Sequence, residues 1–154
     1  MILQAATSED AEELTRIAHA AIASSCLSPS QVEVWTTAFT VERMASAIDE
    51  DTVLMVVQGV RILGFASLRL HGDTAGEIDL WYVDPEFSRR GVGRLVVRGV
   101  EDAARGREMD QLWVDASPAA RHRLSSLGYR VHDSHVKHLG DVRFDNTWMK
   151  KLLR

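Results

Sequence analysis

The chain has 154 residues, of which 45% are hydrophobic and 26% are charged. This length predicts one domain, residues 1–154, with a substantial core. The net charge of -4 at pH 7 gives no electrostatic reason to expect a nucleic acid or an anionic membrane as a partner. No apolar stretch could span a bilayer, the first residues lack the basic segment of a secretory signal, and Cys26 is the only cysteine. We therefore expect a cytoplasmic location.

The first third of the chain predicts one strand followed by three helices. Residues 2–5 are a short apolar segment, and the apolar residues from Leu14 to Ile22 recur at helical spacing. The run Ser28-Pro29-Ser30-Gln31 combines a capping serine, proline in the first turn and glutamine at the third position, so a second helix should begin there. A third helix should begin near Thr40.

The remainder alternates strands with two helices. The expected strands are 52–58, 61–70, 77–83, 111–115, 129–138 and 142–149, and the expected helices are 92–103 and 118–127. With residues 2–5 this order predicts an α+β fold, a mixed sheet of about seven strands with flanking helices.

The segment between the strand at 77–83 and the following helix has the composition of a phosphate-binding loop. It reads Val-Asp-Pro-Glu-Phe-Ser-Arg-Arg-Gly-Val-Gly-Arg-Leu from Val83 to Leu95. A helix that starts here leaves backbone N–H groups unpaired at the positive end of its dipole. Gly91 and Gly93 would let an anion approach the backbone, and three arginines add donors suited to phosphate. These arginines are Arg89, Arg90 and Arg94.

This loop differs from the two commonest phosphate-binding motifs. The Walker pattern needs Gly-Lys-Ser/Thr, and no lysine precedes Lys137. The dinucleotide fingerprint needs a third glycine where Val96 stands. The loop instead resembles the acyl-CoA loop of the GCN5-related N-acetyltransferases, Gln/Arg-x-x-Gly-x-Gly/Ala, with Ser88 in the place of the usual Gln or Arg.

The resemblance covers nearly the whole chain, because the order of elements also matches this family. Three segments are similar to a bacterial branch of it, the YafP-like proteins. They are Ser28-Pro29-x-Gln31-x-x-x-Trp35, the run from Val83 to Val92, and Val114-Asp115-Ala116-Ser117.

The resemblance implies an N-acetyltransferase that uses acetyl-CoA as cosubstrate and requires no metal. The acetyl group would pass to a primary amine by direct attack in a ternary complex. Family members often dimerise through their last strands, but the sequence alone leaves open whether this chain forms a homodimer. The implied acyl-CoA contacts are Trp81, Tyr82, Val83, Ser88, Arg89, Arg90, Gly91, Val92, Gly93, Arg94 and Ser117, with the backbone N–H groups of Tyr82 and Val83 binding the acetyl carbonyl and the pantetheine arm.

Glu77 and Asp79 are the candidate catalytic residues. Strict alternation along the strand would put both on one face together with Trp81, and Ile78, Leu80 and Tyr82 on the other. Two carboxylates beside the loop could take a proton from the amine, and their charge favours a small cationic acceptor. The alternative is that they only face solvent.

The resemblance also implies roles for other residues, and each of these residues has an alternative structural role. Trp35 and Phe39 would line the acceptor pocket or belong to the core, and Ser117 would touch pantetheine or only cap a helix. The family's tyrosine acid falls on Leu124, so that acid is missing. The six histidines show no metal-binding spacing and are expected at the surface.

Two rival functions remain open at the level of sequence. Ser88 and the absent tyrosine at Leu124 would suit a non-catalytic module that binds or senses acyl-CoA. An acetyltransferase for protein N-termini or lysines would need an open groove.

Overall fold

A seven-stranded sheet runs through the molecule in the order β1-β2-β3-β4-β5-β7-β6. The computed structural model describes residues 1–154. Neighbouring strands are antiparallel except β4 and β5, which are parallel. The strands are β1 (Ile2–Ala5), β2 (Thr52–Gln58), β3 (Arg61–His71), β4 (Ala75–Val83), β5 (Gln111–Ala116), β6 (Arg130–Leu139) and β7 (Val142–Leu152). The predicted α+β fold with a mixed sheet is confirmed.

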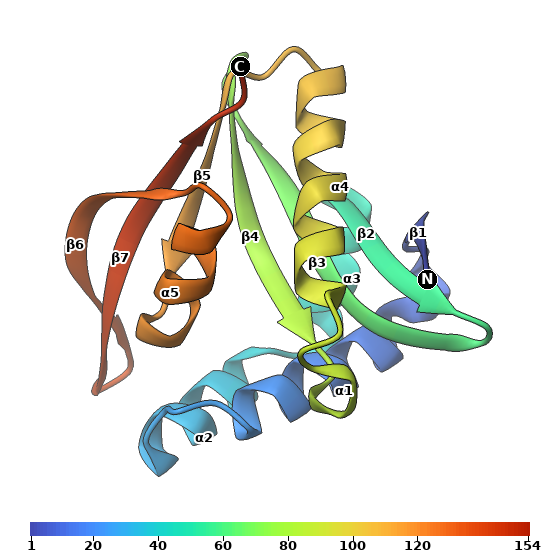
Figure 1. Cartoon of the computed structure of the whole chain (residues 1–154). Coiled ribbons are helices and arrows are strands. Elements are labelled where there is room, and N and C mark those ends of the chain that lie inside the picture. Colours follow the sequence, from blue (N-terminus) through green and yellow to red (C-terminus); the bar gives the residue numbers. More distant parts are fainter.

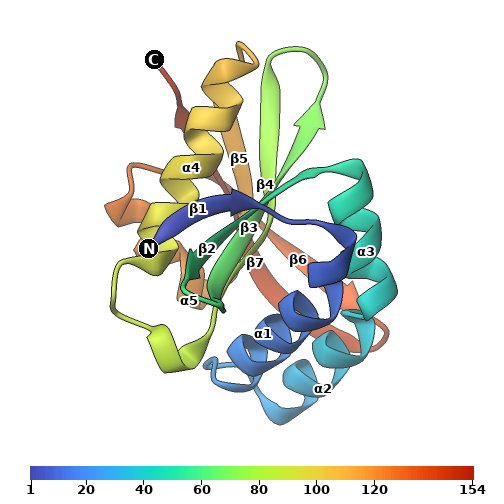
Figure 2. The ribbon, with the colours of Figure 1, turned by 90° about the vertical axis from the view of Figure 1, so that its right-hand side faces the viewer.

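Five helices cover the two faces of the sheet, as Figure 2 shows. Helices α1 (Ala11–Ala23), α2 (Pro29–Ala38) and α3 (Val41–Glu50) lie on one face. Helices α4 (Val92–Gly106) and α5 (Pro118–Ser126) lie on the other. The predicted start signals are confirmed, because the side chains of Ser28 and Thr40 accept hydrogen bonds from the third residues of α2 and α3. No helix is long and apolar enough to cross a membrane.

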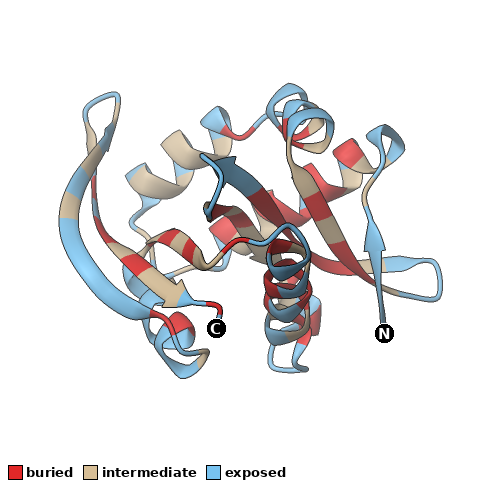
Figure 3. Ribbon diagram, turned by 90° about the horizontal axis from the view of Figure 1, so that it is seen from above, coloured by how far each residue is buried: buried red, intermediate tan, exposed pale blue.

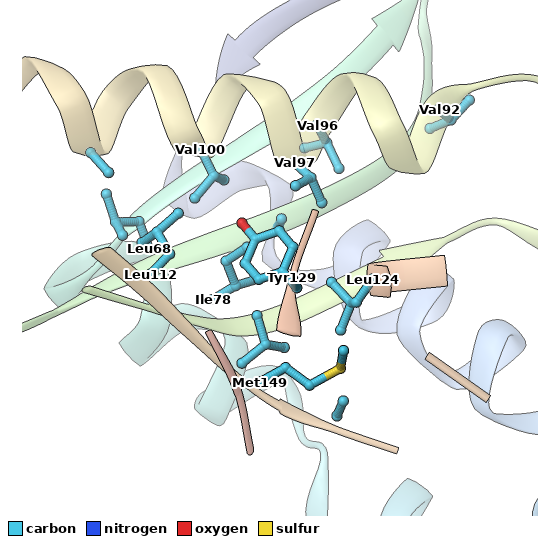
Figure 4. Packing of buried hydrophobic residues seen from close by; sticks show 14 of the residues in the cluster. Leu68, Ile78, Val92, Val96, Val97, Val100, Leu112, Leu124, Tyr129 and Met149 are labelled. Carbon is cyan, nitrogen blue, oxygen red and sulfur yellow. The ribbon is translucent and has the colours of Figure 1, made fainter. Parts of the chain in front are cut away.

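Each face of the sheet carries its own hydrophobic core. Side chains from α4 pack onto β3, β4 and β5, and valines of this helix point toward those strands in Figure 4. The labelled members include Val96, Val97 and Val100 above Leu68, Ile78 and Leu112. The second core joins α1 and α3 to the opposite face of β2, β3 and β4. Strand β6, at the edge of the sheet, is largely exposed (Figure 3).

Strand β4 contains a bulge that reverses the facing of its second half. Leu68 of β3 lies opposite Ile78, but Ala66 lies opposite Trp81, so Asp79 and Leu80 together face the single residue Ser67. The buried Ser67 Oγ accepts a hydrogen bond from the Leu80 N–H at 2.9 Å. Such a bulge adds one residue, bends the strand and increases its twist.

The predicted alternation along β4 is therefore wrong beyond Asp79. Leu80 and Tyr82 lie against the core of α1 and α3, on the side that also carries Asp79. Trp81 faces the α4 side instead, as does Ile78 before the bulge. The two carboxylates share a face as expected, but Trp81 is not on it, because the extra residue shifts every later side chain by one position.

Strands β4 and β5 separate immediately after this point. Their parallel pairing runs from Ala75–Gln111 to Ile78–Val114 and then stops, although both strands continue. In Figure 1 the two strands lie close together at the top and diverge toward the lower part of the molecule. The lower half of β4 therefore has one edge without a neighbouring strand.

Replacing Ser67 by Ala should lower the free energy of unfolding by about 1–3 kcal/mol, because the buried Leu80 N–H would lose its acceptor. Urea unfolding and hydrogen exchange at the Leu80 amide would measure this. Ser25→Ala is a matched control, since its hydroxyl bonds to the Ile22 carbonyl at the end of a helix, and a change within about 0.5 kcal/mol is expected there. Equal stability of the two variants would contradict a structural role for the Ser67 bond.

Candidate functional site

The loop after β4 is fastened to the fold before it reaches α4. Asp84 is 4% exposed, and its carboxylate accepts hydrogen bonds from Arg16 of α1 at 2.8 Å and from the Glu86 N–H at 3.0 Å. Burial alone would raise the pKa of Asp84, but these bonds outweigh burial and hold the pKa below its usual range. The charged carboxylate starts a single 3-10 turn, Pro85–Phe87, which directs the chain toward α4.

The loop then presents a continuous row of free backbone donors. None of the N–H groups from Arg89 to Arg94 donates a backbone hydrogen bond. Gly91, the residue that caps α4, has a φ of 81°, a conformation that suits glycine. These donors lie at the positive end of a helix dipole, which is the arrangement that binds phosphate groups.

Gly93 lies close to the Trp81 ring, a contact that the sequence does not reveal. A Cβ atom on Gly93 would lie 3.3 Å from Cζ2 of Trp81, which is tighter than an ordinary contact. The Trp81 indole N–H also points to the Gly93 carbonyl oxygen at 3.3 Å. The bulge has turned Trp81 to this side, so the indole ring forms a wall beside the start of α4.

A hollow of about 200 Å³ lies over these donors. Its lining residues come from the end of β4, the loop, the start of α4 and the end of α5. They are Trp81, Val83, Phe87, Ser88, Arg89, Gly91, Val92, Gly93, Arg94, Arg123, Ser126 and Leu127. Most of the predicted acyl-CoA residues therefore come together here. Arg90, Tyr82 and Ser117 do not line it, and Arg90 lies over the Phe87 ring at 5.5 Å.

Arg123 is the main residue of this hollow that sequence analysis missed. Its guanidinium lies 4.6 Å from the centre of the Trp81 ring, and burial lowers its pKa. Neither Arg123 nor the loop arginines Arg89 and Arg94 form an ion pair with a carboxylate. The hollow is therefore cationic and lacks any internal counter-charge, which favours an anionic ligand.

The open edge of β4 adds backbone groups next to the hollow. The Asp84 N–H bonds to the Leu63 carbonyl of β3 at 2.9 Å, and the Leu80 N–H bonds to Ser67. In the segment from Leu80 to Asp84, the even-numbered residues therefore direct their N–H groups toward β3. Trp81 and Val83 consequently direct theirs into the gap between β4 and β5. The N–H groups of Val83 and Trp81 therefore share the open edge of β4, whereas the Tyr82 N–H lies on the β3 side.

The two candidate carboxylates are both paired. Glu77 is 9% exposed and its Oε1 lies 2.7 Å from Nε2 of His71. Burial raises the pKa of Glu77, the hydrogen bond from His71 opposes this rise, and the nearby Asp79 charge adds to it. Asp79 lies 3.1 Å from the Arg69 guanidinium, which also reaches Asp51 at 3.5 Å. Neither carboxylate lines the cationic hollow.

On the α1–α3 side of the sheet, α2 closes against β4 and β7. The Trp35 indole N–H bonds to the Tyr82 hydroxyl at 3.0 Å, and the Trp35 ring packs edge-on against Phe144 at 5.2 Å. Gln31 adds a hydrogen bond to the Arg143 carbonyl at 2.8 Å. Phe39 is 0% exposed and belongs to the core, so of the two aromatic candidates only Trp35 is partly accessible.

Both tyrosine hydroxyls take part in hydrogen bonds within the chain, and the position of the family's tyrosine acid is buried. Leu124 of α5 is 0% exposed and belongs to the hydrophobic core between α4 and the sheet (Figure 4). Burial raises the pKa of Tyr82 to about 12. Burial and the charge of Glu101, whose carboxylate accepts the Tyr129 hydroxyl at 2.9 Å, raise the pKa of Tyr129 further above its usual range. Ser117 acts as the cap of α5, because its Oγ accepts the Ala120 N–H at 3.2 Å.

Comparison with known proteins bears on this arrangement. Residues 23–151 match the family model described as acetyltransferase (GNAT) domain. No curated protein matches the chain significantly. A GCN5-related N-acetyltransferase from Rhodopseudomonas palustris is similar in structure with a TM-score of 0.89 and 28% identity, over 98% of this chain and 94% of that one.

Two further structures are similar in fold. The PaiA N-acetyltransferase from Thermoplasma acidophilum, in complex with coenzyme A, has a TM-score of 0.82 and 16% identity, over 99% of both chains. The YncA protein from Salmonella typhimurium, with its cofactor acetyl-CoA, has a TM-score of 0.78 and 20% identity, over 100% of this chain and 94% of that one. From the extent of the family match, the chain belongs to the GNAT acetyltransferase family.

Proposed function

We propose that this protein transfers the acetyl group of acetyl-CoA to a primary amine by direct attack in a ternary complex. The observation that carries the proposal is the row of free N–H groups from Arg89 to Arg94, which opens into a cationic hollow beside the unpaired edge of β4. A pyrophosphate suits the loop, and an extended pantetheine arm with its amide groups suits a strand edge. The coenzyme A and acetyl-CoA bound to the two relatives of similar fold support the same ligand.

The free N–H groups of the β4 edge would also serve the chemistry. Trp81 and Val83 direct theirs into the gap, where a thioester carbonyl would lie. A hydrogen bond to that oxygen stabilises the negative charge that develops when the amine attacks. The amine nitrogen forms the new bond to carbon, the carbon–sulfur bond breaks, and its electron pair leaves on the coenzyme A sulfur.

The acceptor is proposed to be a small cationic amine. Asp51, Glu77 and Asp79 contact Arg69 and His71, and Arg69 is the one permanently charged partner, so carboxylates are in excess on this side of the sheet. Asp79 and Glu77 would hold the ammonium form. The contacts of α2 with β4 and β7 cover part of the sheet face through which an acceptor would reach the gap. This covering supports a small-molecule acceptor over a protein chain.

A non-catalytic acyl-CoA module is the second candidate. The observation in its favour is that Leu124, at the position of the family's tyrosine acid, is packed in the core. A thiolate is a good leaving group near neutral pH, so catalysis does not require that acid. A screen of amines and peptides by release of free thiol separates the two functions, because only the enzyme consumes acetyl-CoA in proportion to the acceptor.

Gly91→Val should weaken acetyl-CoA binding at least about tenfold, or roughly 1.4 kcal/mol, because valine strains the cap of α4 and obstructs its donors. Titration calorimetry would measure the affinity. Gly59→Val is a matched control: Gly59 also has a positive φ, of 61°, with nothing near its Cβ position, but it lies in the β2–β3 turn. A folded Gly91→Val protein that binds as tightly as the control would overturn this assignment of the loop.

Asp79→Asn should lower kcat/KM for a cationic amine at least about tenfold and leave the affinity for acetyl-CoA unchanged, since Asp79 lies outside the cationic hollow. Steady-state kinetics with a diamine and with an uncharged-chain monoamine would measure the effect of charge. Asp102→Asn, at an exposed pair on α4, is the control. A near-native kcat/KM in Asp79→Asn would move the role to Glu77.

The rate should rise with pH and show no descending limb between about pH 7 and pH 10. The reason is that Tyr82, with a pKa raised to about 12, keeps its proton throughout this range, as does Tyr129 with its higher pKa. The profile of kcat/KM measured to pH 10 checks this expectation. A descending limb that Tyr82→Phe abolishes would show that the Tyr82 hydroxyl supplies a proton.

A further inference from the structure

A histidine–carboxylate pair lies on the far side of the gap from Asp79. Asp115 is the first residue of β5 beyond the segment paired with β4, as Asp79 is on β4. The neighbours of Asp115, Val114 and Ala116, are buried in the α4 core, so the Asp115 side chain points to the opposite face, which Asp79 shares. Two carboxylates therefore flank the point where the strands separate.

His135 of β6 is held in one orientation by this carboxylate. Its Nε2 lies 2.7 Å from Asp115 Oδ1, and its ring stacks on Trp148 with 5.7 Å between centroids and 20° between planes. A neutral imidazole that donates from Nε2 keeps its lone pair on Nδ1. This nitrogen has no hydrogen-bond partner within the chain. Hydrolase triads use the same principle, a carboxylate that fixes the tautomer of a histidine base, with the roles of the two ring nitrogens exchanged.

Asn146 of β7, which lies opposite His135 in the sheet, contains an unsatisfied acceptor. Its side chain is 3% exposed, and its Oδ1 has no hydrogen-bond partner. Leaving a buried polar atom unpaired costs about 1–3 kcal/mol, so such an atom usually serves a ligand or another function. Strand register puts the side chains of Asn146 and His135 on the face that Asp115 shares, opposite the side covered by α5.

We propose that this face of β5, β6 and β7, next to the gap, receives the acceptor amine of the reaction proposed above, on which the inference rests. Asn146 Oδ1 accepts one N–H of the amine, His135 Nδ1 accepts the proton that the amine loses, and Asp115 positions the imidazole and stabilises its charged form. The nitrogen–carbon bond forms as the carbon–sulfur bond breaks. The proton then passes from the imidazolium to the coenzyme A thiolate or to water, which restores neutral His135.

Aromatic and charged side chains surround His135. Trp113 packs edge-on against Trp148, the ring on which His135 stacks, with 6.5 Å between centroids. The charged groups on this face are Asp115 from β5, Lys137 from β6, which lies 5.3 Å from the centre of the Trp35 ring, and Lys150 from β7, which lies 5.1 Å from the centre of the Trp113 ring. Asp115 alone lies within ion-pair distance of the imidazole. Asp79, on the other flank, is paired with Arg69 at 3.1 Å.

The test uses the amine that gives the fastest turnover and a second, weakly basic amine that stays neutral over the pH range. His135→Gln should lower kcat/KM about 100- to 10,000-fold with unchanged acetyl-CoA affinity. With the weakly basic amine it should also abolish the rise of rate with pH. Added imidazole should restore part of the activity of His135→Ala, and Asp115→Asn should shift the pH profile. His138→Gln, an exposed histidine on the same strand, should behave as the unchanged protein.

Each result is decisive. Native kcat/KM and an unchanged pH profile in His135→Gln would overturn this inference and leave the acetyltransferase function standing. Loss of activity in His135→Ala without rescue by imidazole, or with weaker acetyl-CoA binding, would assign a structural role to His135 and also overturn it. If the unchanged protein binds acetyl-CoA but acetylates no amine, the proposed function itself fails, and this inference with it.

Discussion

The geometry of the site depends on the hydrogen bond between Ser67 and the Leu80 N–H, because this bond accommodates one additional residue in β4. The extra residue bends the strand, and the pairing with β5 ends next to it. It also directs Trp81 to the α4 side and Tyr82 to the α1–α3 side. The bulge thus has two consequences. It leaves one edge of β4 open, and it puts an aromatic ring on each side of the gap, Trp81 on one side and Tyr82 on the other.

The two sides of the gap differ in how their charges are compensated. On the α4 side, Arg89, Arg94 and Arg123 have no carboxylate partners, so a multiply charged anion can replace water around them. On the other side, the carboxylates Asp79 and Asp115 are each joined to a cationic or titratable partner. In the proposed reaction this field would direct an anionic cosubstrate and a basic acceptor to opposite faces of one sheet.

The handling of protons follows from packing as well as from charge. Leu124 and Tyr129 belong to the core beneath α4, so neither supplies an acid at the cationic hollow. Tyr82 is tied to Trp35 and keeps its proton. A base that cycles its proton back to the leaving thiolate would remove the need for a separate acid. The narrower resemblance to the YafP-like branch stays a prediction.

The sequence by itself determined the features that depend on neighbouring residues. The order of elements, the caps of α2, α3 and α5, and the anion-binding loop were all predicted, because a capping side chain or a helix start is built from residues within one or two turns. Membership of the GNAT family followed from the same local motifs.

Only the tertiary structure decided what meets across the gap. The bulge in β4 arises from pairing with Ser67, which is distant in sequence, so periodicity along β4 alone put Trp81 on the wrong face. Arg123 of α5 reaches Trp81 of β4 only in the folded chain. His135 reaches Asp115 across β7, which lies between β5 and β6 in the sheet. Sequence patterns record which face of an element is apolar, whereas the partner of each polar side chain is set by how the elements pack.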